Sequence, residues 1–175
     1  MRQKHIFSLE LICEMTRELK KQGITVGFTH GAFDLFHTSH LDLLQKAAKK
    51  CDLLVVGIES DDRVEGYKAY GRPIIPEKER LGLISQISCV DVAFIIRELP
   101  LTSQGARELY REIKPDFIAI GQSYAVEKRI RGDAFSTGAS LVKINTIQDQ
   151  TTTKIINRIL NTYKRKISQE YKFRS

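Results

Sequence analysis

The sequence predicts one doubly wound α/β domain in which helices flank a five-stranded parallel sheet. The first observation is a set of short, nearly continuous apolar runs, which are typical of strands buried on both faces. These runs lie at residues 25–29, 53–58, 92–96, 116–120 and 140–144. The second observation is that helical patterns separate the runs. Alternating strands and helices imply parallel pairing through right-handed crossovers, with helices on both faces of the sheet.

Helices are predicted from apolar spacing and from start and stop signals. Apolar residues three and four positions apart between Leu9 and Leu19 predict an amphipathic first helix, with Ser8 as its N-cap and Gly23 beyond its end. The other predicted helices lie at residues 39–50, 76–88, 102–114, 124–138 and 151–166. The apolar face of the first helix is also a candidate interface for a homodimer.

Length and composition indicate a globular protein. The chain has 175 residues, of which 42% are hydrophobic and 28% charged, and we expect one domain over residues 1–163 followed by a basic tail over residues 164–175. No stretch approaches the roughly 20 apolar residues of a membrane span, and the first residues lack a secretory signal, so we expect a cytoplasmic protein. Three widely spaced cysteines in apolar segments predict buried thiols and no metal site.

An excess of positive charge predicts an anionic partner. The formal net charge is +7, and residues 164–175 hold five basic residues beside one acidic residue. A basic surface attracts nucleotides, sugar phosphates and nucleic acids alike, so charge does not choose among them. We favour small phosphorylated ligands over nucleic acid, because no nucleic-acid-binding motif accompanies the basic tail.

The segment FTHGAFDLFHTSH, residues 28–40, is the part of the chain that bears most directly on function. It follows the first predicted strand, and doubly wound sheets bind ligands at the carboxyl ends of their strands. With Gly31 in the turn and a helix beginning near Ser39, backbone N–H groups would face a common anion site. His37 and His40 could then donate to a bound phosphate. The alternative is that His37 caps the helix and His40 packs against the sheet.

Four motifs in order resemble those of the cytidylyltransferase-like nucleotidyltransferases. The segment GAFDLFHTSH resembles the family signature, which ends in His-X-Gly-His. The segments CDLLVVGIESD, YGRPIIPEKER and TTTKIINRI resemble the second strand, the basic loop and the start of the last helix. Within the family the layout is most similar to bacterial heptose 1-phosphate adenylyltransferases, and glycerol-3-phosphate cytidylyltransferases are more distant. The resemblance implies a Rossmann-like fold.

The resemblance also implies a reaction. AMP or CMP would pass from a nucleoside triphosphate to a phosphorylated small acceptor, such as a sugar 1-phosphate, and pyrophosphate would leave. The acceptor attacks directly, so the protein must align the reactants and neutralise charge rather than supply a nucleophile. Mg²⁺ would be bound through the nucleotide phosphates. Similarity favours ATP over CTP. The alternatives are a catalytically silent nucleotide-binding regulator and a glycerol-3-phosphate-type cytidylyltransferase.

The matched motifs imply roles for single residues. The residues assigned to catalysis are His37, His40, Lys68 and Arg80. Those assigned to nucleotide binding are Thr29, Gly31, Ala32, Phe33, Ser39, Gly121, Thr151, Thr152 and Thr153. Those assigned to acceptor binding are Asp34, Arg72 and Tyr124. In this assignment Lys68 and Arg80 hold the triphosphate.

Some of these residues also have a simpler structural interpretation. Asp34 could stabilise its own loop, Lys68 could be a solvated loop lysine, and one threonine of residues 151–153 could only cap the last helix. The chain also departs from the family pattern. Ser39 replaces the glycine of His-X-Gly-His, where its Cβ could crowd the nucleotide. Residues 120–124 read Ile-Gly-Gln-Ser-Tyr where related adenylyltransferases have Lys-Gly-Gly-Asp-Tyr, which points to an altered acceptor specificity.

Overall fold

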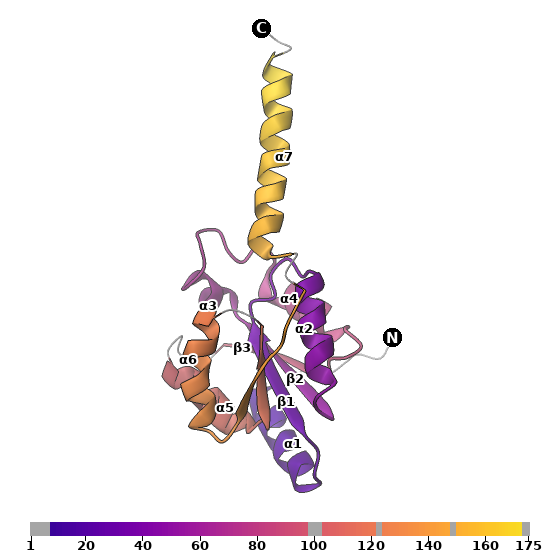
Figure 1. Cartoon of the computed structure of the whole chain (residues 1–175), viewed down its shortest axis with the longest axis vertical. Helices are drawn as coiled ribbons and strands as arrows, with labels where there is room; N and C mark the ends of the chain where they lie inside the picture. Colours follow the sequence, from indigo (N-terminus) through magenta and orange to yellow (C-terminus); the bar gives the residue numbers. More distant parts are fainter. Residues whose placement is uncertain (1–7, 98–102, 122–123, 148–149, 173–175) are drawn as a thin grey trace.

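The computed structural model describes residues 8–97, 103–121, 124–147 and 150–172. Its centre is a five-stranded parallel sheet with the strand order β3-β2-β1-β4-β5. The strands are β1 (Val26–Gly31), β2 (Leu53–Glu59), β3 (Val92–Ile96), β4 (Phe117–Ile120) and β5 (Ser140–Lys143). All five predicted strands are confirmed. The direction of winding reverses at β1, which lies between β2 and β4 (Figure 1).

The helices of the described residues follow the predicted order. They are α1 (Leu9–Lys21), α2 (Thr38–Ala48), α3 (Asp61–Glu65), α4 (Glu77–Ser85), α5 (Ser103–Ile113), α6 (Tyr124–Phe135) and α7 (Thr152–Lys172). The short α3 is absent from the sequence prediction, because five residues are too few to show a helical period in their apolar spacing. It begins directly after β2, with Ser60 in the N-cap position.

Helices cover both faces of the sheet, so the doubly wound prediction is confirmed. On one face α1, α5 and α6 enclose a core that contains Phe28 and Tyr110. On the other face α2 and α4 enclose a core that contains Leu44 and Ile84. These four side chains are fully buried, and burying one of this size contributes roughly 1.5–3 kcal/mol. The central strand β1 is therefore held from both sides, which fixes the position of the loop at its carboxyl end.

Helix α1 has the caps that the sequence predicts. The Ser8 side chain accepts a hydrogen bond from the Leu11 N–H at 3.4 Å, and Gly23 beyond the helix has a φ of +80°, which glycine adopts without strain. The Thr16 hydroxyl donates to the Ile113 carbonyl at 3.0 Å and ties α1 to α5. The apolar face of this helix therefore packs within its own chain, and a homodimer stays a prediction.

Helix α7 extends away from the sheet domain as a single helix (Figure 1). It continues to Lys172, beyond the predicted end at residue 166, and it passes residue 163 without a break. Apolar side chains such as Leu160 and Tyr163 are exposed along it. In the part of the chain that the structure describes, no helix is both long and apolar enough to cross a membrane.

Candidate active site

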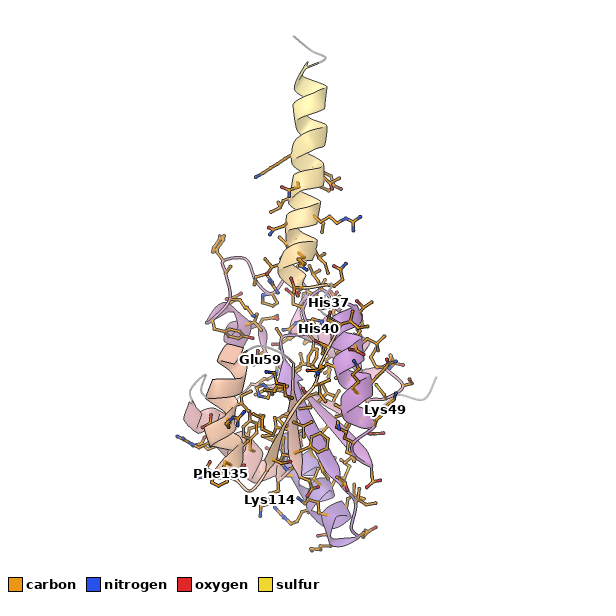
Figure 2. The ribbon with its side chains drawn as sticks, in the orientation of Figure 1. His37, His40, Lys49, Glu59, Lys114 and Phe135 are labelled. Carbon is orange, nitrogen blue, oxygen red and sulfur yellow. The ribbon has the colours of Figure 1, made fainter. Side chains whose placement is uncertain are left out.

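A pocket of about 250 Å³ opens at the carboxyl ends of β1, β2 and β4. Doubly wound folds bind ligands at this edge, where the strand order reverses. The pocket is lined by residues 29–34, His40, Leu43, Glu59, Tyr67, Lys68, Arg72, residues 119–121, Ile130 and Thr152. Figure 2 places His37, His40 and Glu59 at this end of the sheet and Lys114 at the opposite end. The loop after the first strand is therefore part of a pocket, as predicted.

The turn that leaves β1 has no glycine at its left-handed positions. β1 continues through Gly31, and the left-handed backbone falls instead on Phe33 (φ 49°) and Leu35 (φ 44°). The prediction that Gly31 forms the turn is therefore wrong. A left-handed conformation costs a non-glycine residue roughly 1–2 kcal/mol, so contacts from other parts of the chain must hold this turn in place.

Asp34 supplies the largest set of these contacts. Its buried carboxylate accepts hydrogen bonds from the N–H groups of Ile74 and Ile75, both at 2.9 Å, and pairs with Arg72 Nε at 2.6 Å. Burial raises the pKa of Asp34, but these hydrogen bonds and the Arg72 charge outweigh burial and hold the pKa below its ordinary value. The structure supports the loop-stabilising interpretation of Asp34, and it places Arg72 in the same ion pair.

Protonation of Asp34 at low pH should lower the free energy of unfolding. An ionised Asp34 contributes stability that is complete above the unfolded pKa of about 3.9 and is lost as the pH falls through the lower folded pKa. We expect Asp34→Asn to unfold at a lower urea concentration than the unchanged protein at about pH 6, and the difference to shrink below about pH 4. Other carboxylates titrate in both proteins and cancel from the difference. A difference that persists undiminished at about pH 2 would contradict this role.

His37 and His40 face each other across the first turn of α2. Their rings are stacked, with centroids 3.8 Å apart and 19° between the planes, and His40 lines the pocket. Phe33 and Phe36 lie against the His40 ring, at 5.4 and 5.6 Å between centroids. His37 occupies the N-cap position, but its side chain makes no capping hydrogen bond. The histidines are therefore brought together, and the alternative that His37 caps the helix holds for its position but not for its side chain.

Both imidazoles lie in surroundings that favour the neutral form. Burial lowers the pKa of His37. Burial, together with the neighbouring His37, lowers the pKa of His40 to about 3 although Asp34 opposes this shift. Within the described residues, the buried Nδ1 atoms of both rings have no hydrogen-bond partner. An unpaired buried nitrogen costs free energy in the folded protein, which is typical of a group retained for a ligand.

Ser39 is directed away from the pocket. It is the second residue of α2, which begins at Thr38 and so near Ser39 as predicted, and it is not among the residues that line the pocket. Its hydroxyl lies within hydrogen-bond reach of the carbonyl oxygens of Ile147 and Gln150, the latter at 3.0 Å. One hydroxyl proton serves one carbonyl at a time. The serine therefore ties α2 to the segment that precedes α7.

Removing this hydroxyl should cost stability. Ser39→Ala is expected to lower the free energy of unfolding by about 1 kcal/mol, because it leaves a carbonyl without its donor. Ser39→Gly should cost about 2 kcal/mol, because glycine also weakens the first turn of the helix. Ser39→Thr keeps the hydroxyl and is the matched control. Urea unfolding measures all three variants, and equal stability of Ser39→Ala and Ser39→Thr would count against the contact.

The cations assigned to the substrates lie in different environments. Lys68 is exposed and lines the pocket, with its ammonium 5.1 Å from the centre of the Tyr67 ring. Arg72 also lines the pocket, although its Nε is engaged by Asp34. Arg80 is not among the lining residues and is only 2% exposed. Of the three, Lys68 has the freedom to reach a bound phosphate.

Arg80 binds three parts of the chain to one another. Its guanidinium donates to the Ile75 carbonyl at 2.8 Å, to the Ala32 carbonyl, and to the Asp61 carboxylate at 2.7 Å. These partners belong to the loop before α4, the turn after β1 and the start of α3. The structure therefore gives Arg80 the role of fixing the pocket wall.

Several residues assigned to the nucleotide do reach the pocket. Those that line it are Thr29, Gly31, Ala32, Phe33, Gly121 and Thr152. The Thr152 hydroxyl donates to the Asp34 carbonyl at 2.8 Å. Thr151 accepts from the Lys154 N–H at 3.1 Å and so caps α7, whereas Thr153 is exposed and does not line the pocket. Tyr124 begins α6, but its side chain lies outside the described residues.

Sequence reasoning missed a group of polar residues in the same pocket. His30, Glu59 and Tyr67 line it, and Tyr110 from α5 lies with its hydroxyl 2.9 Å from His30 Nε2. The Tyr67 hydroxyl donates to Glu59. The available signal was the position of His30 and Glu59, which are polar residues at the carboxyl ends of otherwise apolar strands.

Known proteins are similar to this chain in sequence and in architecture. The cytidylyltransferase-like family matches residues 28–168. The chain is similar to the bifunctional protein HldE of Syntrophotalea carbinolica, at 37% identity over 158 residues that cover 89% of this chain and 30% of that protein. HldE of Helicobacter pylori strain HPAG1 is 35% identical, over 90% of this chain and 32% of that protein. The lipopolysaccharide core biosynthesis protein from Thermoplasma volcanium has a similar structure, at 27% identity and a TM-score of 0.59, over 72% of this chain and 100% of that one.

The chain spans about a third of the length of these HldE relatives. The family match nevertheless covers most of the chain, and it includes the histidine loop, the pocket and the start of α7. The sequence match, the parallel sheet and the position of the pocket are all consistent with this family. The chain therefore belongs to the cytidylyltransferase-like family of nucleotidyltransferases.

Proposed function

We propose that this protein transfers AMP from ATP to a phosphorylated small acceptor, a sugar 1-phosphate in the first instance, and releases pyrophosphate. The observation that carries this proposal is the stacked pair of imidazoles, His37 and His40, whose buried Nδ1 atoms lack a partner within the described residues and of which His40 lines the pocket. The preference for ATP over CTP and for a sugar phosphate is supported by similarity to HldE proteins.

The proposed reaction is a direct transfer that needs no covalent enzyme intermediate. A phosphate oxygen of the acceptor attacks the α-phosphorus of the triphosphate, and the bond from that phosphorus to the oxygen bridging the α- and β-phosphates breaks. The electron pair of that bond leaves with pyrophosphate. Negative charge develops on the α-phosphate oxygens and on the leaving group, so donors placed there lower the barrier. His40 is suited to the α-phosphate and the exposed Lys68 to the β- and γ-phosphates.

An anion in the pocket would change the protonation of the histidines. Burial is the main reason that the pKa of His40 is low. A neighbouring phosphate would raise this pKa, because its negative charge favours the charged imidazolium. Substrate binding is therefore expected to be coupled to proton uptake. An imidazole that gains charge beside the reacting phosphate becomes a stronger donor in the transition state.

Mg²⁺ belongs to this proposal as part of the bound nucleotide. Among the described residues no group of three or more His, Cys, Asp or Glu side chains could hold a metal ion, and Mg²⁺ commonly reaches transferases through substrate phosphates. The ion would neutralise phosphate charge during the transfer. The chain itself would orient the phosphates through His40, Lys68 and the turn that Asp34 and Arg80 hold.

A catalytically silent regulator is the second candidate, and its main support in the sequence is Ser39. The structure weakens that support, because the Ser39 hydroxyl is bonded to the segment before α7 and the residue does not line the pocket. This position supports the proposal that the replacement of glycine by serine leaves nucleotide binding intact.

Pyrophosphate release tests the proposal. ATP and CTP are each combined with sugar 1-phosphates, glycerol 3-phosphate and flavin mononucleotide in the presence of Mg²⁺. The fastest turnover is expected with ATP and a sugar 1-phosphate. A preference for CTP with glycerol 3-phosphate would instead identify a cytidylyltransferase of that type. Nucleotide binding without turnover of any pair would identify the regulator.

A further inference from the structure

A buried imidazole and a buried carboxylate meet in the wall of the pocket. His30 ends the apolar part of β1 and Glu59 ends β2, and His30 Nδ1 lies 3.4 Å from Glu59 Oε1. Their side chains are only 9% and 6% exposed. Tyr110 lies beside His30, and the Tyr67 hydroxyl donates to the second Glu59 oxygen. We call these four residues the polar cluster.

Glu59 is ionised despite its burial. Burial raises its pKa, but hydrogen bonds from His30 and Tyr67 and the nearby charge of Arg63 outweigh burial and lower the pKa of Glu59 to about 2. Replacing a buried ionic group of this kind by apolar residues is often neutral or stabilising, so such a group is weak evidence for a role in stability. Its position in a pocket wall instead suggests a role toward a ligand.

His30 and Glu59 line the same pocket as His40 and Lys68, but they come from the strands β1 and β2. His30 is paired in register with Gly57 of β2, so Glu59 lies just beyond it on the neighbouring strand. The lining residues His40 and Lys68 come from α2 and the loop after α3. The pocket therefore combines imidazole and ammonium groups that suit a phosphate with a carboxylate that repels one.

The free lone pairs of the Glu59 carboxylate and the nearby charge of Arg63 indicate which groups of a ligand Glu59 can bind. A carboxylate accepts about four hydrogen bonds, and Tyr67 and His30 account for two of these directions. The remaining lone pairs can accept from hydroxyl groups. An ammonium group is a poorer candidate, because the charge of Arg63 already offsets that of Glu59. The contact of His30 Nδ1 with Glu59 is long, at 3.4 Å, and Nδ1 has no other partner within the described residues.

We propose that His30 and Glu59 form the subsite that recognises the hydroxyl groups of the acceptor. The acceptor phosphate lies toward His40 and Lys68, and its hydroxyl-bearing carbons lie toward Glu59. The carboxylate thus orients the acceptor, because it repels the phosphate and attracts the uncharged end. This inference rests on the proposed function and specifies the acceptor as a phosphorylated polyhydroxyl compound.

The test combines a change in the protein, Glu59→Gln, with the removal of single hydroxyl groups from the ligand, and compares the effects of the two changes on binding affinity. The affinity of hexose and heptose 1-phosphates is measured by titration calorimetry with Mg²⁺ and a non-hydrolysable ATP analogue, and so are the monodeoxy analogues of each compound. Glu59→Gln keeps the shape and removes the charge. It is expected to weaken acceptor binding about tenfold, because a charge-assisted hydrogen bond becomes a neutral one. Affinity for the ATP analogue should stay within about twofold.

The deoxy analogues separate recognition from a structural effect. In the unchanged protein at least one deoxy analogue should bind about tenfold more weakly than its parent compound, and in Glu59→Gln that difference should shrink, because the amide oxygen accepts only a neutral hydrogen bond. Glu65→Gln, an exposed carboxylate at the end of α3, is the matched control and should bind like the unchanged protein. His30→Gln serves in the same cycle where Glu59→Gln does not fold.

Several results would overturn the inference. They are a deoxy difference that is undiminished in the variant, a loss of nucleotide rather than acceptor affinity, and the absence of binding by every sugar phosphate. Failure of the proposed function looks different. In that case no pair of substrates is turned over, yet the calorimetric cycle still reports whether Glu59 contacts a hydroxyl.

Discussion

Replacing His40 by alanine is expected to lower kcat for pyrophosphate release by about 10²–10³-fold, which is the usual cost of removing one donor from a charge-stabilising site. His40 lines the pocket, and its buried Nδ1 has no hydrogen-bond partner among the described residues. The ring therefore has hydrogen-bonding capacity for the α-phosphate. Steady-state kinetics with saturating ATP and acceptor measures the effect, and circular dichroism shows whether the variant is folded.

The matched control for His40→Ala is Gln45→Ala, an exposed residue on the same helix. It should leave kcat within about twofold, because surface substitutions away from a site have small effects. His40→Asn keeps a donor in a shorter side chain and should recover part of the loss. A kcat for His40→Ala within about threefold of the unchanged protein would remove His40 from the reaction.

The second large effect is expected at Arg80. Arg80→Ala should lower the free energy of unfolding by about 3 kcal/mol or more, because removing one partner of a buried ion pair leaves buried oxygens without donors. The Asp61 side chain is 35% exposed, so water can compensate that partner, and the two carbonyls account for most of the cost. Urea unfolding in the absence of nucleotide measures this directly.

Two further measurements distinguish a structural Arg80 from one that binds phosphate. Lys78→Ala, an exposed cation on the same helix, is the control and should be nearly neutral. Arg80→Lys should also lose stability, since one ammonium cannot reproduce the three directions of the guanidinium. If Arg80→Lys instead unfolds like the unchanged protein and shows only a weaker ATP affinity, then Arg80 leaves its three contacts and binds the triphosphate.

The fold was predictable because the apolar pattern of each strand and of most helices lies within a short segment of the sequence. The inner strands of the sheet are buried on both faces and are therefore continuous apolar runs, and the helices α1, α2, α5 and α7 each show an apolar period. The prediction missed α3, whose five residues contain no full period, and misplaced the turn after β1. That turn depends on Asp34, which binds the N–H groups of Ile74 and Ile75 some forty residues away.

The candidate site was predictable only in part. The motif located His37 and His40, because both lie on one short helix start whose spacing brings them together. It did not reveal that Thr151 caps α7 while Thr152 faces the pocket, since adjacent positions on a helix point in different directions. Nor did it reveal His30 and Glu59, which the parallel register of β1 and β2 brings into contact.

By itself the sequence determined the fold class, the order of the long elements and the location of the loop that lines the pocket, because these follow from apolar runs and from motifs in consecutive residues. Only the tertiary structure decided which polar groups face that pocket. Arg80 has the right charge for a phosphate, yet its guanidinium is bound to Ala32, 48 residues away. The partner of a buried polar group depends on chain packing over such distances, and the local sequence does not contain that information.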